Sequence, residues 1–266
     1  MEKIGTFLKD MGLRFISWLF MTFGLIAVWG WVLSTVTEHA IKNLHGRLGY
    51  YILMFFSIVG TPLHELSHWL GCKLFGFRIY DVDLFRPRAA MYDGVLGYVS
   101  FIYDKDNIWQ QFGCTFTAMA PLIFGTIVMF LILRFAFPEA KKEIDECIAK
   151  AKEKGKSGWL SYFASFAKGY YYGLFDLKGW GVLRGILVTY VLISISMSMT
   201  LSFADIRVAL TGIWIIAAAY LIFAIITAIR KTEYKEKVKK VGSFISCILS
   251  VGLFFNLVMF VLTWIF

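Results

Sequence analysis

The stretch TPLHELSHWLGCKLFG, residues 61–76, places two histidines and a glutamate inside an apolar run. His64 and His68 are two of only four histidines in the chain, and Glu65 directly follows the first. Residues four apart lie on the same face of a helix, so both imidazoles can reach one metal ion. Because ionisable groups are costly in an apolar run, the stretch predicts a membrane helix that carries part of a functional site.

The composition around this stretch is that of a multi-pass membrane protein. Of the 266 residues, 59% are hydrophobic and 17% are charged, and a soluble domain of this length would need more polar surface. The net charge of +9 comes with no basic face of the kind that binds nucleic acid, so we expect no nucleic-acid partner. We expect an integral multi-pass protein of a prokaryotic cell membrane, surrounded by the lipid bilayer.

Six apolar runs are long enough to cross a bilayer, which takes about 20 residues. We therefore predict an all-α polytopic membrane protein with about six transmembrane helices, forming one membrane-embedded domain over residues 1–266. Three connectors are polar: a short link, a helical and interfacial segment that starts at Pro138, and a basic loop; they cover 36–47, 138–180 and 230–240. The six runs are 13–35, 48–75, 108–136, 182–204, 207–229 and 242–266.

The connector at 77–103 differs from the others because it has strand periodicity. Apolar and acidic residues alternate around Asp83, and Asp93-Gly94 lies between two β-rich stretches, which is a hairpin signal. We expect a small β-hairpin directly after the histidine helix. Its free edge could bind an extended peptide by strand addition. The candidate substrate-binding residues at this edge are Val95, Gly97, Tyr98 and Val99.

The His-Glu-x-x-His spacing is that of a zinc site. Neutral imidazoles and a carboxylate hold zinc with one position open, and the pKa of water in that position falls to about 7. Glu65, about 100° round the helix from His64, would take the proton from this water and return it to a leaving amine. We thus predict Zn²⁺ as the cofactor, His64 and His68 as ligands and Glu65 as the catalytic base. The alternative is a solvated helix end at the membrane interface.

A third ligand must come from elsewhere in the chain. The fourth apolar run ends in SISMSMTLSFADIRVAL, with Asp205 at its C-terminal end. In six alternating spans the second and fourth run parallel, so Asp205 would reach the side of the membrane where the histidines lie. Asp205 could instead cap the helix that begins near Ile206. Five other carboxylates are possible third ligands: Glu38, Asp81, Asp83, Asp93 and Asp176.

The motif HELSH on a membrane helix, the strand GYV at residues 97–99 and a later intramembrane aspartate resemble the site-2 protease family of intramembrane zinc metalloproteases. The resemblance implies membrane helices packed around the HExxH helix, with a β-element beside the active site. It also implies membrane-anchored protein or peptide substrates, zinc binding by His64, His68 and Asp205, and catalysis by Glu65. The chain departs from the family pattern in two places. Asp205 lacks the common Leu-Asp-Gly context, and MAPLIFG, residues 119–125, lacks the asparagine of Gly-Pro-x-x-Asn.

Pro121 in that second motif is expected to kink its helix, because proline removes one backbone hydrogen bond. The kink could open a path for substrate and water, or it could be a tolerated feature.

Two further points stay open. Most of the basic residues lie on the side opposite the site, so the positive-inside rule places the site away from the cytoplasm, whereas the resemblance places it near the cytoplasmic face. Besides a protease, the chain could be a non-catalytic metal-binding scaffold or pseudoprotease, a small transporter, or a zinc hydrolase that acts on a non-peptide bond. The scarcity of other charges in mid-helix disfavours transport, and the hairpin favours a peptide substrate.

Overall fold

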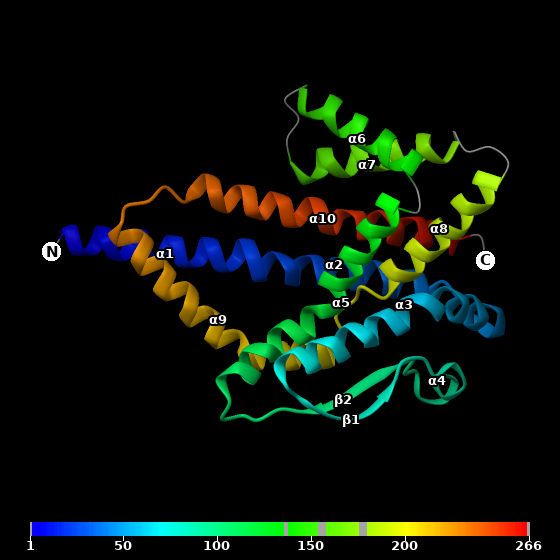
Figure 1. Cartoon of the computed structure of the whole chain (residues 1–266), viewed down its shortest axis with the longest axis horizontal. Coiled ribbons are helices and arrows are strands. Elements are labelled where there is room, and N and C mark those ends of the chain that lie inside the picture. The colour runs from blue at the N-terminus through cyan, green and yellow to red at the C-terminus, as the bar shows by residue number, and fades with distance from the viewer. Residues whose placement is uncertain (1, 136–137, 154–157, 176–179, 265–266) are drawn as a thin grey trace.

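A computed structural model of the chain describes residues 2–135, 138–153, 158–175 and 180–264. Helices make up most of it, and a small antiparallel sheet lies along one side (Figure 1). The elements before the second strand are α1 (Glu2–Leu19), the π-helical turn η1 (Phe20–Gly24), α2 (Leu25–Lys42), α3 (Gly46–Phe75), β1 (Arg78–Asp83), α4 (Pro87–Asp93) and β2 (Tyr98–Ile102). The remaining elements are α5 (Ile108–Phe135), α6 (Pro138–Glu153), α7 (Trp159–Phe175), α8 (Trp180–Met197), α9 (Phe203–Ile229) and α10 (Lys235–Leu262).

Four helical stretches of the described chain are long and apolar enough to cross a membrane: Lys3–Lys42, Ile108–Phe135, Phe203–Ile229 and Lys235–Leu262. The helical fold with a small sheet is therefore confirmed, whereas the count of six spans is not. The other two expected runs form α3, which carries the histidines and Glu65, and α8, whose apolar part is shorter.

Two expected polar connectors are shorter than the sequence suggested. Helix α2 continues through most of the 36–47 link, because Thr37 and Ala40 are buried while Glu38 and His39 face outward, so this segment is an amphipathic helix end. Likewise, α10 begins at Lys235, within the expected 230–240 loop. Only residues 43–45 and 230–234 connect these helices.

Helices α8 and α9 meet at an angle: in Figure 1, α8 descends toward the middle of the molecule and α9 rises from there toward the end of the chain's long axis where α1 begins. Residues 198–202 break the helical path between them, so α8 ends before the expected end of the fourth apolar run at residue 204. Helices α3 and α8 run parallel, as expected, and pack closely. The close contact between α3 and α8 requires glycine at position 60, because an added Cβ there would lie 1.9 Å from the carbonyl oxygen of Ser194.

The two strands pair antiparallel, from Arg78 opposite Ile102 to Asp83 opposite Tyr98, with an irregularity between Ile79 and Asp81. The expected β-element is thus present, but Asp93-Gly94 is not its turn. The short helix α4 connects the strands, with proline at its first position and Gly94 in the left-handed conformation (φ 73°) at its end. Proline favours the first turn of a helix and glycine its C-terminal cap, which explains why residues 87–93 are helical.

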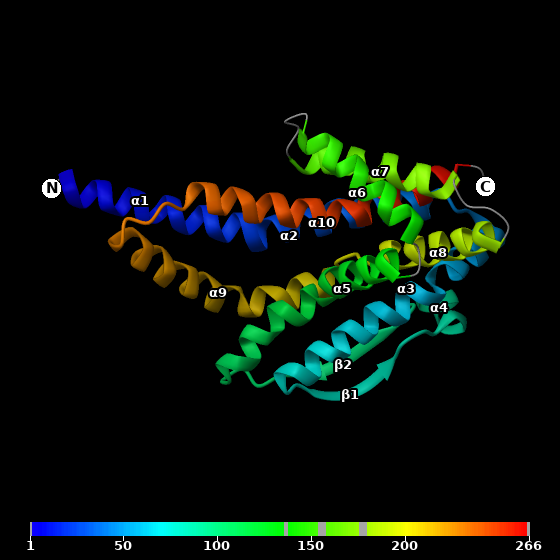
Figure 2. The ribbon, with the colours of Figure 1, turned by 45° about the horizontal axis from the view of Figure 1, so that its top comes forward.

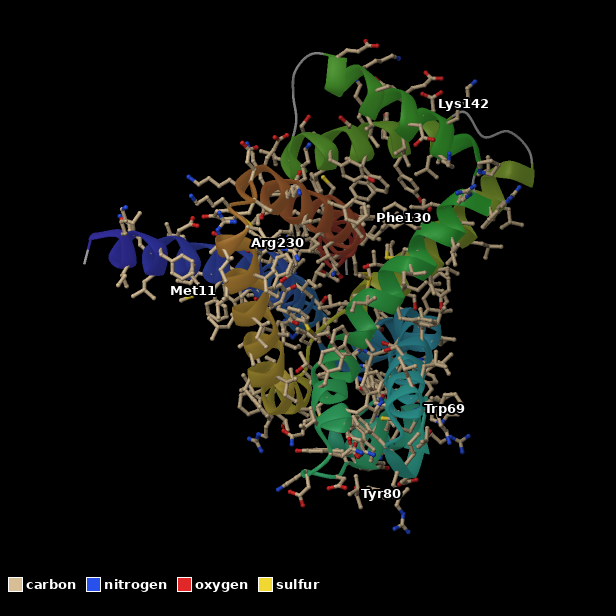
Figure 3. All side chains as sticks on the ribbon, turned by 60° about the vertical axis from the view of Figure 1, so that its left-hand side comes forward. Met11, Trp69, Tyr80, Phe130, Lys142 and Arg230 are labelled. Carbon is tan, nitrogen blue, oxygen red and sulfur yellow. The ribbon has the colours of Figure 1, made fainter. Side chains whose placement is uncertain are left out.

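The 138–180 connector begins with α6 at Pro138, as expected, and α6 packs against α7, which in turn packs against α10. In Figure 3 many α6 side chains around Lys142 end in nitrogen and oxygen, as do side chains near Tyr80 on the sheet. Large apolar side chains are exposed along the long helices, among them Trp31, Leu210 and Trp214. An exposed apolar surface of this extent is what a lipid-facing helix presents.

Candidate metal centre

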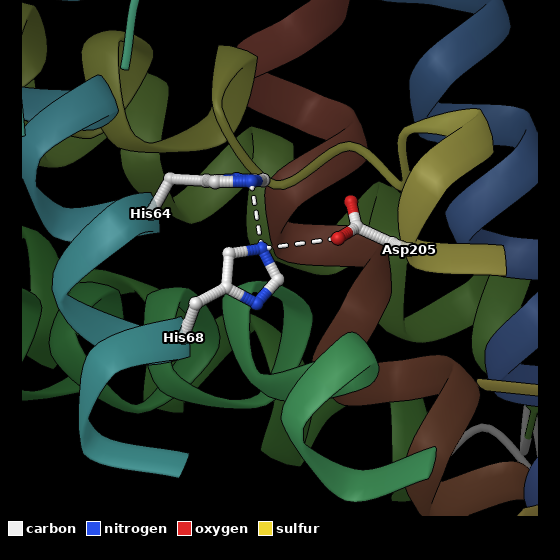
Figure 4. A group of neighbouring side chains, drawn as sticks. All are labelled: His64, His68 and Asp205. Atoms are coloured by element: carbon white, nitrogen blue, oxygen red, sulfur yellow. Dashed lines mark hydrogen bonds and ion pairs between the residues drawn. The ribbon is translucent and has the colours of Figure 1, made fainter. Parts of the chain in front are cut away.

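Three side chains far apart in the sequence converge beside the interruption between α8 and α9 (Figure 4). His64 and His68 come from consecutive turns of α3, and Asp205 comes from the first turn of α9. The Nε2 atom of His68 lies 3.1 Å from Nε2 of His64 and 3.2 Å from Oδ1 of Asp205. Within the described chain these residues form the one group of histidine, cysteine or acidic side chains that could hold a metal ion, with ligand atoms within 4.8 Å of one another.

The outer nitrogen of each imidazole is held by a backbone carbonyl. Nδ1 of His64 donates to the Ser198 carbonyl at 2.6 Å, and Nδ1 of His68 donates to the Thr117 carbonyl at 2.8 Å. A carbonyl oxygen can only accept, so both Nδ1 atoms carry the proton, and in a neutral imidazole Nε2 is then a bare lone pair. Two lone pairs therefore face each other, with a carboxylate oxygen beside them.

This donor set fits a zinc ion. Zinc prefers imidazole nitrogen and carboxylate oxygen, and Zn–N bonds of 2.0–2.1 Å give a tetrahedral edge of about 3.3 Å. The two short separations between ligand atoms, 3.1 and 3.2 Å, are close to this edge. The ligand atoms of the third pair, His64 and Asp205, lie within 4.8 Å of each other. Histidine ligands commonly donate their other ring N–H to a carbonyl, as both do in this protein.

Asp205 has two roles, one for each of its oxygens. Oδ1 faces His68, whereas Oδ2 accepts from the backbone N–H of Ser202 at 2.9 Å and from its hydroxyl at 2.7 Å. The Ser202 hydroxyl oxygen also accepts from the backbone N–H of Asp205 at 3.1 Å, which completes a capping box at the start of α9. The N-cap is therefore Ser202, and the cap fixes the Asp205 carboxylate in a position where it can also act as a ligand.

The interruption that presents Ser198 and Asp205 is stabilised by polar side chains from neighbouring helices. Asn256 of α10 donates to the Ser196 carbonyl at 3.1 Å and accepts from the Thr37 hydroxyl at 3.1 Å. The Ser34 hydroxyl oxygen accepts from the backbone N–H of Leu201 at 3.1 Å. These bonds satisfy backbone groups that a continuous helix would have paired, which an apolar environment requires.

Glu65 lies beside the sheet rather than among the ligands. Its residue is 7% exposed, and an added Cβ at Gly97 would lie 2.8 Å from Cγ of Glu65. The backbone just before β2 therefore packs directly on this side chain. Among the described residues no side chain or backbone N–H donates to the Glu65 carboxylate, so it is available to accept a proton.

The other predicted substrate-binding residues lie further along the same segment. Val95 is exposed; Tyr98 and Val99 pair with β1, and Val99 packs against the cluster around Cys72 and Phe75. The Tyr98 hydroxyl donates to Asp81 at 2.6 Å, which raises the pKa of Tyr98 above its ordinary value. Substrate binding at this edge stays a prediction.

Of the alternative third ligands, the four that lie in the described residues are not brought to the histidines. The Asp81 carboxylate accepts from Tyr98, Asp93 pairs with Arg86, and Glu38 is exposed on α2. Asp83 lies in β1 opposite Tyr98, and Asp176 lies outside the described residues.

An apolar cavity of about 440 Å³ lies next to Asp205, between η1, α2, α5 and α9. Its walls include Phe20, Phe23, Met119 and Leu210. Asp205 is the charged residue in its lining, because the other lining side chains are apolar except Thr115, whose hydroxyl donates to the Ala209 carbonyl. An apolar group placed there would lie beside Asp205.

Three contributors to the site were not anticipated from the sequence: the carbonyls of Thr117 and Ser198, and the Ser202 cap. Backbone carbonyls leave no residue-type signal. Ser202 could have been found, because SFAD, residues 202–205, has the spacing of a capping box.

Comparison of the chain with protein-family models, with curated proteins and with solved structures found no match.

Proposed function

We propose that this protein is a zinc-dependent endopeptidase of the membrane, similar in design to the site-2 proteases, which cleaves membrane-anchored protein or peptide substrates. One observation carries the proposal: two imidazole lone pairs and a carboxylate oxygen converge on one point, 3.1 and 3.2 Å apart, directly beside the buried Glu65. Three protein ligands with one open position are typical of catalytic zinc sites, whereas structural sites have four.

The residues of the chain divide the chemistry between them. When bound, zinc acts as a Lewis acid and makes water nucleophilic near neutral pH. His64, His68 and Asp205 hold the ion, and the carbonyls of Ser198 and Thr117 fix the orientation of the two rings. Glu65, which has no competing donor in the described chain, takes the proton from the attacking water and delivers it to the leaving amine.

Two features favour a peptide substrate that lies close to the membrane. The β2 segment packs on Glu65 through Gly97, so an extended chain paired with the sheet would pass the catalytic base. The cavity beside Asp205 is apolar, as expected for a site that receives apolar side chains. Four helices long and apolar enough to cross a membrane support location in the bilayer.

A non-catalytic function is the second candidate, because the same geometry can be satisfied without metal. A proton on Nε2 of His68 would let this nitrogen donate to Nε2 of His64 or to Oδ1 of Asp205. The protein would then be a pseudoprotease or a scaffold.

Metal analysis of the purified protein tests whether the site holds a metal ion, which the proposed endopeptidase requires. We expect close to one zinc per wild-type chain and loss of zinc in His68→Ala, because the remaining pair of ligands cannot hold the ion. The measurement is elemental analysis after dialysis against a weak chelator, with His39→Ala, an exposed histidine on α2, as the matched control. Wild-type protein that retains no zinc after reconstitution would contradict the proposal.

Gly97→Ala tests the contact between the sheet and the catalytic base. The new methyl group would lie 2.8 Å from Cγ of Glu65 and 2.9 Å from the Leu84 carbonyl oxygen, so either Glu65 or the strand must move. We expect peptide hydrolysis to fall by about tenfold or more, since small misplacements of catalytic groups are costly, while zinc content stays unchanged. Gly12→Ala in α1, where an added Cβ meets nothing within 4 Å, is the control. Full activity in Gly97→Ala would show that this contact does not position Glu65.

A further inference from the structure

Pro121 lies in the interior of α5, four residues after Thr117. In an α-helix the backbone N–H of a residue donates to the carbonyl four residues earlier. Proline has no N–H, so the carbonyl of Thr117 receives no bond from position 121. That same carbonyl accepts the Nδ1–H of His68 at 2.8 Å.

We propose that Pro121 is a positioning residue for the metal centre, because it frees the Thr117 carbonyl to orient His68. The inference rests on the proposed zinc site. It gives Pro121 a role that a kink does not require: the missing backbone donor selects which nitrogen of His68 is protonated, and hence which nitrogen faces His64 and Asp205.

The packing of α3 on α5 supports this role. At Gly71, three residues after His68, an added Cβ would lie 2.8 Å from the Thr117 hydroxyl oxygen and 3.1 Å from the Thr117 Cα. The two helices thus meet at Thr117, and the His68 ring lies against the freed carbonyl. Among the described residues the buried hydroxyl of Thr117 has no hydrogen-bond partner, and it is the backbone carbonyl that meets the imidazole.

Pro62 in α3 provides an internal comparison. It also lies in a helix interior, and it leaves the Ile58 carbonyl without its helical donor in the same way. No described histidine donates to the carbonyl of Ile58, whose residue is 49% exposed. A proline in a helix interior is therefore not sufficient to hold a histidine. Pro121 differs from Pro62 because the carbonyl that it frees lies against the ring of His68.

The test is metal affinity in Pro121→Ala, with Pro121→Ser as a second variant that also restores the backbone N–H. The new N–H competes with His68 for the Thr117 carbonyl, and the loss of such an outer partner typically weakens metal binding by about 10–100-fold. We expect this loss in Zn²⁺ and Co²⁺ titrations, together with a changed visible spectrum of the Co²⁺ form. The melting temperature of the metal-free protein should be unchanged or higher, because proline is unfavourable in a helix interior.

A positioning role predicts weaker metal binding with an unchanged or higher melting temperature. A structural role would instead lower both the melting temperature and the metal affinity. Pro62→Ala should leave the affinity and the Co²⁺ spectrum as in the wild type. Wild-type affinity and spectrum in both Pro121 variants would overturn the inference but not the proposed zinc site. Failure of the wild-type protein to bind either metal would overturn the proposed function, and this inference with it.

Discussion

Glu65→Gln should reduce peptide hydrolysis by about 10²–10⁴-fold, the contribution of a positioned general acid–base group, and leave zinc content near one per chain. Glutamine has almost the same shape, so the contact between Glu65 and the Gly97 backbone is kept, but an amide cannot take a proton from water. Glu65 is also not among the three converging ligands. The assay is cleavage of a single-span membrane-anchored protein in liposomes, with fragments identified by mass spectrometry.

A stability measurement belongs beside that assay. Glu65 is buried, so an activity loss is informative only if the melting temperatures of the variant and the wild type agree. Hydrolysis at the wild-type rate in a folded, zinc-loaded Glu65→Gln protein would exclude Glu65 as the base. Absence of cleavage by the wild type, with zinc bound, would favour the pseudoprotease.

Asp205→Asn should weaken zinc binding by at least about 100-fold, beyond the usual effect of an outer-shell residue. An asparagine keeps a side-chain oxygen that can accept from Ser202, so the start of α9 is preserved, but it loses the carboxylate charge that faces His68. The measurement is a zinc competition titration with a chromophoric chelator.

Ser202→Ala provides the complementary variant. Removal of an N-cap side chain costs about 1 kcal/mol of stability, whereas the backbone N–H of Ser202 still donates to Oδ2 of Asp205. We expect a lower melting temperature and a change in zinc affinity of less than about tenfold. If Asp205→Asn instead lowers the melting temperature and leaves the zinc affinity unchanged, Asp205 is only a capping residue.

The sequence was most informative for candidate ligands that lie about one helical turn apart. His64 and His68 are four apart, so their shared face followed from the helix alone, and the structure brings their Nε2 atoms together. Asp205 was also predicted, from the expectation that the second and fourth apolar runs are parallel, as α3 and α8 are. The break at residues 198–202, which ends α8 before the expected end of the fourth run at residue 204, was not predicted.

The features that could not be predicted from the sequence depend on backbone groups and on contacts between residues distant in the chain. Residues 198–202 are apolar enough to extend α8; the hydrogen bonds from Asn256 and to Ser34 that stabilise the interruption come from helices distant in sequence. The Asp93-Gly94 signal favoured a two-residue turn, but Pro87 started a helix that Gly94 ends. Both errors arose because a short local sequence pattern favoured one backbone conformation, whereas the structure adopts another whose hydrogen bonds or helix caps are provided by other residues.

The arrangement of donors also bears on how the protein folds. Both Nδ1 atoms donate to carbonyls. The metal-free site therefore places two imidazole lone pairs and a carboxylate oxygen, all of negative potential, next to one another in a largely buried region. This is local frustration, which a bound metal ion or a proton on Nε2 of His68 would relieve. With the proposed zinc site, metal binding and folding would be thermodynamically linked, so free zinc in the compartment would influence the population of the native state as well as the number of loaded sites.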